Sequence, residues 1–147
     1  MSLKHARNLL YWFISSIIVV LGVSLAAKAA RPPADLNYAL HKPTAGGHYI
    51  ASLESQKTPV PVGAMHTWVV TVTTPAGDPL DDIQISIGGG MPQHGHGLPS
   101  RPRITKHLGQ GKHLIEGMKF NMPGWWILTL SIEGAGGADS ATFNLAL

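Results

Sequence analysis

Hydrophobic and polar residues alternate along much of the chain after residue 45, with the period of two that is typical of half-buried β-strands. The alternation is found in residues 67–73, 82–87, 126–132 and 141–147, and less regularly in 48–54 and 112–120. Turns rich in Pro and Gly separate these segments. Six or seven short strands without a helical pattern predict an all-β fold, an immunoglobulin-like antiparallel β-sandwich of about seven strands. A small β-barrel is the alternative.

The N-terminal part of the chain has a different pattern. Lys4 and Arg7 precede an apolar run over residues 9–27, which ends at Ala27-Lys28-Ala29, a sequence typical of signal-peptidase sites. The run also has about the length that spans a bilayer, roughly 17 to 25 residues. Both an export signal and a retained membrane anchor therefore fit the sequence.

These patterns predict three parts. We expect residues 1–29 to be a signal peptide or an N-terminal membrane anchor, with a hydrophobic helix. Residues 30–44 contain several prolines and are expected to form a linker, and residues 45–147 are expected to form the sandwich domain. The domain would then be periplasmic or otherwise extracytoplasmic. It would be anchored in the inner membrane by residues 9–27 if these are kept.

Charge and cysteine content narrow the classes of function. The whole chain has 11 basic and 8 acidic residues and no Cys. Without the basic residues Lys4, Arg7 and Lys28, the remaining chain has eight of each sign. It lacks the basic excess of nucleic-acid-binding proteins, so no nucleic-acid partner is expected. An exported domain without disulfides depends on an ordinary apolar core, for which about 115 residues are enough.

The strongest candidate for chemistry is the segment from Met91 to Gly97, Met-Pro-Gln-His-Gly-His-Gly, with one thioether and two imidazoles. His is the commonest metal ligand, and Met is a soft ligand that favours copper(I). Zinc fits less well, because its sites use Cys, His and carboxylate, and no carboxylate lies near this segment. We therefore expect copper, with His94 and His96 as the primary ligands.

Two other predicted strand ends offer similar donors. His66 precedes the strand at 67–73, and Met122 lies at the end of the strand at 112–120. If these strand ends meet, Met91, Met122 and His66 would complete the ligand set. The positive charges of Arg101 and nearby basic residues would oppose a bound cation unless these side chains point away.

Each candidate also has a structural interpretation. His66 fits a hydrogen bond to a loop carbonyl, and the pair His94 and His96 fits a tight or pH-sensitive loop. Met118 fits core packing, and Met122 fits core and site equally well. The remaining domain histidines are expected at solvated positions: His48, His107 and His113.

Catalytic signatures are missing from the sequence. The chain has no Gly-x-Ser-x-Gly, no His-Glu-x-x-His, no phosphate-binding loop and no Cys nucleophile. The acidic residues show no paired arrangement. We therefore expect a protein without enzymatic activity.

Three segments resemble the YtkA-like domain, which is grouped with FixH-like proteins. They run from Met65 to Trp68, from Gly90 to Pro99 and from Glu116 to Trp126, and the resemblance extends over residues 45–147. It implies a small exported or membrane-anchored immunoglobulin-like sandwich. FixH-like proteins are associated with maturation of cbb3-type cytochrome oxidase alongside a copper-transporting ATPase. The resemblance thus implies copper handling, with an envelope copper protein or an oxidase assembly factor as partner.

The expected function is therefore copper binding or copper delivery by a non-enzymatic domain of the cell envelope. One alternative is a metal-free protein-interaction or structural module of the envelope, in which the segment around His94 and His96 is only a loop. Another is a β-sandwich that binds a small organic ligand between its sheets.

Overall fold

The structure is a computed structural model that describes residues 32–147. The predicted N-terminal helix and the predicted signal peptide or anchor, residues 1–29, lie outside the described residues. Asp35–Leu147 form a compact unit. Within residues 32–147 no helix has the length and apolar character needed to span a membrane.

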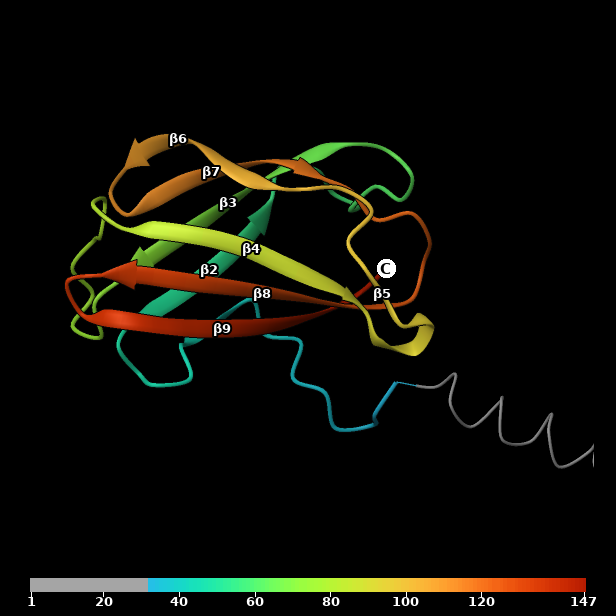
Figure 1. The fold of residues 1–147 in the computed structure, drawn as a ribbon, viewed down its shortest axis with the longest axis horizontal. Coiled ribbons are helices and arrows are strands. Elements are labelled where there is room, and N and C mark those ends of the chain that lie inside the picture. The colour runs from blue at the N-terminus through green and yellow to red at the C-terminus, as the bar shows by residue number, and fades with distance from the viewer. Residues whose placement is uncertain (1–31) are drawn as a thin grey trace, which may run out of the picture. The chain divides into compact units, whose positions relative to one another are not determined.

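Residues 32–147 contain nine strands in two sheets, and every pairing between strands is antiparallel (Figure 1). The five-stranded sheet has the order β1 (His41–Pro43), β2 (Ile50–Ser55), β3 (His66–Thr73), β7 (Lys112–Met118) and β6 (Arg103–Gly109). The four-stranded sheet has the order β5 (His96–Gly97), β4 (Gln84–Met91), β8 (Trp125–Gly134) and β9 (Gly137–Ala146). A single 3-10 turn, η1 (Pro92–His94), joins β4 to β5. The prediction of an all-β fold with antiparallel sheets is confirmed.

The strand count exceeds the predicted seven because three strands carry little alternation. β1 and β5 contain three and two residues, and β6 is an edge strand whose side chains are mostly exposed. The pairing of β6 with β7 is also irregular in two places, which interrupts a period of two. β1 lies inside the range expected to be linker, so the five-stranded sheet begins before residue 45.

The core lies between the two sheets, where the inward side chains of the predicted strands are buried. On β8 these are Trp126, Leu128, Leu130 and Ile132, and on β3 they are Trp68, Val70 and Val72. Met118 is also fully buried, as its core interpretation predicts. Trp125 lies on the opposite face of β8, where its indole N–H donates to the Asn144 side chain at 3.0 Å. The period of two therefore predicts correctly that Trp126 faces the core and that Trp125 lies on the outer face.

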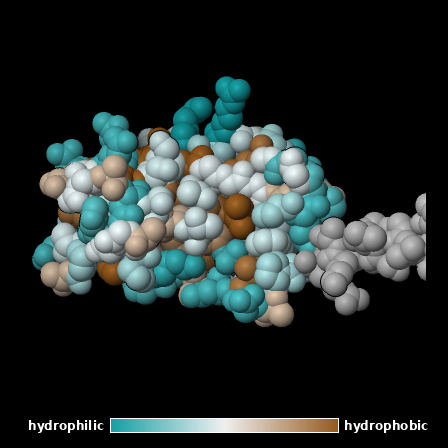
Figure 2. All heavy atoms as spheres, turned by 60° about the horizontal axis from the view of Figure 1, so that its bottom comes forward, coloured by the Kyte–Doolittle hydropathy of each residue, from teal (hydrophilic) through white to brown (hydrophobic). Residues whose placement is uncertain are grey.

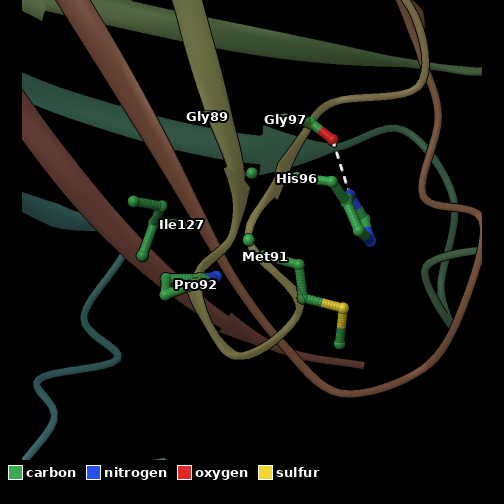
Figure 3. A pocket seen from close by; sticks show the side chains of 8 residues that line it. Gly89, Met91, Pro92, His96, Gly97 and Ile127 are labelled. Carbon is green, nitrogen blue, oxygen red and sulfur yellow. Dashed lines mark hydrogen bonds between the residues drawn. The ribbon is translucent and has the colours of Figure 1, made fainter.

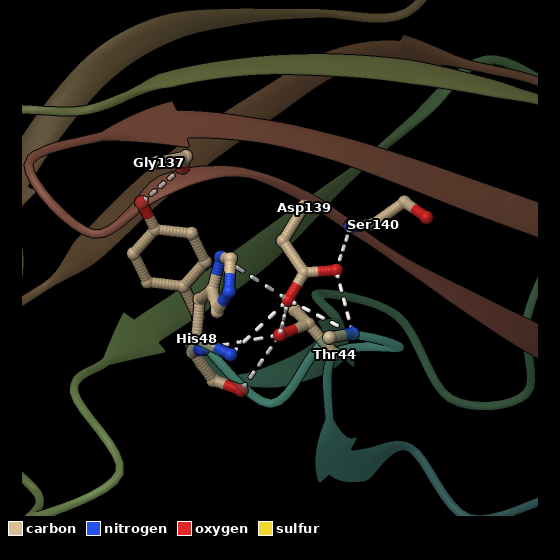
Figure 4. Close-up of polar contacts among 7 residues, drawn as sticks. Thr44, His48, Gly137, Asp139 and Ser140 are labelled. Atoms are coloured by element: carbon tan, nitrogen blue, oxygen red, sulfur yellow. Dashed lines mark hydrogen bonds and ion pairs between the residues drawn. The ribbon is translucent and has the colours of Figure 1, made fainter.

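A buried carboxylate ties the turn between β1 and β2 to β9 (Figure 4). Asp139 accepts hydrogen bonds from the Thr44 hydroxyl at 2.6 Å and from the backbone N–H groups of Gly46, His48 and Ser140. These hydrogen bonds stabilise the charged carboxylate by more than its partial desolvation destabilises it. The Thr44 bond has the largest effect, and together they hold the pKa of Asp139 far below its usual range.

The surface of the described domain is largely polar. On the face in Figure 2, hydrophilic side chains surround small, separate apolar areas. The large apolar side chains that are well exposed in residues 32–147 are Tyr38, Val62, Met65 and Leu108. Val62 and Met65 belong to one loop, between β2 and β3, and Met65 is 61 % exposed.

Candidate metal centre

The structure brings the three His- and Met-bearing segments to one end of the sandwich. His66 at the start of β3 pairs with Met118 at the end of β7, and Gly90 at the end of β4 pairs with Ile127 near the start of β8. The rings of Phe120 and Trp126, which follow β7 and begin β8, lie 5.2 Å apart between their centroids. The strand ends that the sequence could place only separately are therefore neighbours.

The chain reverses sharply at this end through η1. Gly95 ends the turn in the left-handed conformation (φ 64°), and its N–H lies 3.0 Å from the Met91 carbonyl. The chain then runs back along β4 as β5, so that Met91 and His96 are opposite each other in the ladder. Gly90 permits this pairing because a Cβ there would collide with the His96 carbonyl.

The two imidazoles of this turn have a spacing that fits one metal ion. The ring centroids of His94 and His96 are 6.1 Å apart. A ring nitrogen binds a metal at about 2.0 Å, which places two rings on one ion with centroids roughly 5 to 6.3 Å apart. His94 is exposed and His96 is half-buried, so a metal ion would reach them from solvent.

The His96 ring is oriented by its own backbone. Its Nδ1 lies 2.9 Å from the Gly97 carbonyl, which can only accept, so Nδ1 donates and Nε2 keeps the lone pair. A backbone carbonyl on the second nitrogen is the usual support of a metal-binding histidine. His96 also lines a hollow of about 360 Å³ with Met91, Pro92, Ile127 and glycines of the turn. Figure 3 shows the side chains of His96 and Met91 extending to the same side of the turn.

The two methionines of the predicted ligand set differ in their surroundings. Met91 is only 1 % exposed, and its terminal methyl lies against Gly124, where a Cβ would collide with it. Met122 is half-buried against the core, and its carbonyl accepts a hydrogen bond from the Trp126 indole at 3.1 Å. Met91 thus has a packing role as well as its proximity to His96.

His66 is in the same end of the sandwich but not beside His94 and His96. The Phe120 ring lies 5.5 Å from His66, and the Trp126 ring lies 5.5 Å from His96, so two aromatic rings connect the histidines. His66 is 5 % exposed, and its Nδ1 lies 3.1 Å from the Ala64 carbonyl, as its structural interpretation predicts. Its Nε2 is buried without a hydrogen-bond partner, which is unusual for a polar atom.

Two of the basic residues whose charge would oppose a nearby cation line a different hollow. Arg101 and Arg103 line a separate hollow of about 220 Å³ with Met65 and Glu116. No Lys, Arg, Asp or Glu lines the hollow at His96. Across residues 32–147, no group of three or more His, Cys, Asp or Glu is arranged to hold a metal ion. A metal at this end would therefore depend on the thioether.

One expectation about the other histidines is wrong. His113 was expected at a solvated position, but it is fully buried, because it lies in phase with Ile115 on the inward face of β7. The same period of two that found the core strands contains this signal. His48 and His107 are exposed, as predicted. The rings that separate His66 from His96, those of Phe120 and Trp126, are fully buried core side chains.

Comparison with known proteins gives one match. The family model described as YtkA-like matches residues 39–131, which include β1, η1, most of β8 and all the strands between them. No curated protein and no solved structure matches the chain.

Proposed function

The chain belongs to the YtkA-like family, and from this we propose that it is a non-enzymatic, immunoglobulin-like domain that binds or delivers copper in the cell envelope. His94, His96 and Met91 are the ligands that this proposal places nearest the ion. Met122 belongs to the same proposed donor set, and His66 is a more distant donor at the same end of the sandwich.

The spacing of His94 and His96 is the observation that carries the proposal. Their 6.1 Å centroid separation lies within the range for two imidazoles on one ion. The Gly97 carbonyl already holds His96 in the tautomer that a metal requires. Little further ordering of the His96 ring is then needed when the ion binds.

Copper suits these donors better than other metals. A thioether and imidazoles are soft or intermediate ligands, whereas magnesium and calcium prefer oxygen. Met91 lies opposite His96 in the ladder, and no carboxylate lines the hollow. The thioether favours copper(I), and the imidazoles bind both copper oxidation states.

His66 extends the donor set toward the interior. Its Nδ1 lies against the Ala64 carbonyl, so the buried Nε2 carries a lone pair that no described group satisfies. Met118 faces it across the β3–β7 ladder. We propose His66 as a secondary position that copper reaches only if Phe120 and Trp126 move.

The proposed location follows from residues 1–29. An apolar run after two basic residues supports export, with the domain in the periplasm and residues 9–27 as cleaved signal or inner-membrane anchor. The partner of such a domain would be another envelope copper protein or an oxidase assembly factor.

A specific observation also favours a metal-free interaction module. Val62 and Met65 expose apolar side chains from one loop, 42 % and 61 % respectively, at the same end as η1. Exposed apolar residues that lie close together often mark protein contacts. In this second candidate function the loop docks a partner, and the turn at His94 only shapes the surface.

Copper titration of the full chain tests the proposal. The chain is titrated with copper(I) and copper(II) against a competing chelator of known affinity. The His94→Ala/His96→Ala variant should bind at least about 100-fold more weakly, because both imidazoles are lost. The matched control is His41→Ala/His48→Ala, which removes two exposed histidines outside this end and should bind as the unmodified chain does.

The outcomes separate the two candidate functions. If the unmodified chain binds neither oxidation state more tightly than micromolar, the copper proposal is wrong. A partner that is retained by the metal-free chain and lost on Met65→Ser would instead support the interaction module.

A further inference from the structure

The second pair of histidines lies at the opposite end of the sandwich from η1, where the β6–β7 turn meets the β3–β4 connection (Figure 1). His107 on β6 and His113 on β7 are opposite each other in the ladder. Their Nδ1 atoms are 2.8 Å apart, and the rings are nearly perpendicular. The Nε2 of His113 lies 3.0 Å from the carbonyl of Leu80, in the β3–β4 connection.

These contacts define where the protons are. The Leu80 carbonyl can only accept, so Nε2 of His113 donates to it and Nδ1 of a neutral His113 is an acceptor. His107 must then donate its Nδ1 proton to His113. One proton therefore lies between the two rings. A further proton on Nε2 of His107, an exposed residue, leaves this arrangement intact.

A second proton between the rings does not fit. It would add an N–H at Nδ1 of His113, directed at the N–H of His107 at hydrogen-bond distance. It would also place a positive charge on a ring that is fully buried. The closed pair thus holds one charge at most.

We propose that the His107–His113 pair is an acid-sensitive clasp, which closes this end of the sandwich when one proton is shared and opens it when both rings are protonated. The clasp joins the β6–β7 hairpin to the β3–β4 connection, two parts that are separated along the chain. This inference does not depend on copper binding, because it concerns the other end of the domain.

The groups around the pair are consistent with this behaviour. Asp81, in the β3–β4 connection next to Asp82, favours a charged His113, but one of its oxygens already accepts the Gly111 N–H at 2.7 Å. Lys106 and Lys112 neighbour the two histidines on their own strands, and both of these side chains are exposed. β3 contributes only the apolar Val70 and Val72 to this part of the core.

Burial has the largest effect on His113 and lowers its pKa below the ordinary value of 6.5. The charge of His107 acts in the same direction, while the Leu80 hydrogen bond and Asp81 oppose it. Because the pKa of His113 is lower in the closed form than in the open form, the closed form is most stable at pH values above the open-form pKa. This stabilisation is lost as the pH falls below about 6.5 toward the lower pKa of the closed form.

Opening would release backbone hydrogen bonds that can be observed. The Gly111 N–H is bound to Asp81, and the Leu80 N–H donates to the Val72 carbonyl at 3.1 Å. If opening takes up one proton, the ratio of open to closed forms rises by up to about tenfold per pH unit once the pH is below the pKa of the open form. Hydrogen exchange at these two amides therefore reports on the clasp.

The test combines ring nitrogen-15 NMR with amide hydrogen exchange on the full chain. At pH 7 the His113 ring should carry its proton on Nε2. Between pH 6.5 and 5.5, protection of the Gly111 and Leu80 amides should fall about fivefold after correction for intrinsic exchange, because the open form is only half protonated at pH 6.5. Finding the proton on Nδ1 of His113, or unchanged protection at both amides, would overturn the proposal.

Three variants sharpen the test. His113→Gln keeps a donor for the Leu80 carbonyl but cannot titrate, so its protection should not depend on pH in this range. In His107→Ala the neighbouring charge is absent, and His113 should titrate at a higher pH by NMR. His41→Ala removes an exposed histidine on β1 and should behave as the unmodified chain does. A His113→Gln chain that loses as much protection as the unmodified chain would contradict the clasp.

Discussion

Substitutions at Met91 can distinguish its packing role from its proposed role as a metal ligand, because the thioether and the side-chain volume can be removed independently. Met91→Leu removes the sulfur and keeps most of the apolar volume. Met91→Ala removes both. The side chain is 1 % exposed and touches Gly124, so almost all of its surface contributes to packing.

The two substitutions should differ in stability by an amount that burial sets. Truncating a buried Met to Ala costs about 2–5 kcal/mol, whereas a change to Leu costs less than about 1.5 kcal/mol. The copper(I) affinity of the two variants should not follow this order, because Leu is no better a ligand than Ala. Both variants should lose at least tenfold in copper(I) affinity, or about 1.4 kcal/mol.

Urea unfolding followed by circular dichroism measures the first effect, and chelator competition measures the second. The copper(II) affinity should change less than the copper(I) affinity, since imidazoles dominate binding of the oxidised ion. If Met91→Leu binds copper(I) as tightly as the unmodified chain, Met91 is not a ligand. If Met91→Leu unfolds as easily as Met91→Ala, the packing argument is wrong instead.

Two further predictions concern the turns at the two ends. Asp139→Asn should lower the melting temperature at pH 7, because four donors lose a charged acceptor. A carboxylate with a lowered pKa stabilises the fold above its ordinary pKa of 3.8, so the difference from the unmodified chain should shrink as the pH falls below that value. Asp82→Asn, at an exposed carboxylate, is the control, and an equal effect there would refute the role of Asp139. Gly95→Ala should cost about 1 kcal/mol in urea unfolding, because φ is 64° at this position, and Gly88→Ala, at ordinary φ with open space around it, should cost less.

Much of the fold follows from local pattern. β8 alternates over most of its ten residues and β9 over its second half, and the sequence alone predicts which of Trp125 and Trp126 faces the core. β5 could not be predicted, because two residues cannot establish a period. It exists because Gly90 and Gly95 allow the chain to fold back along β4.

The candidate site was predictable in composition but not in arrangement. The donor types of Met91, His94 and His96 are evident in the sequence, and their meeting depends on a turn of seven residues. The position of His66 depends instead on how the two sheets pack, which involves residues far apart in the chain. Sequence therefore could not show that Phe120 and Trp126 lie between His66 and His96.

The hydrogen bonds accepted by Asp139 also have a consequence for the order in which the chain folds. The bonds from Asp139 to Thr44, Gly46 and His48 join residues that are 95, 93 and 91 positions apart. Closing so long a loop costs entropy before the bonds are made, so contacts of this separation tend to form late in folding. We therefore expect these bonds to form after the transition state, once β9 has joined its sheet. In that case the Asp139 hydrogen bonds lower the unfolding rate and leave the folding rate almost unchanged.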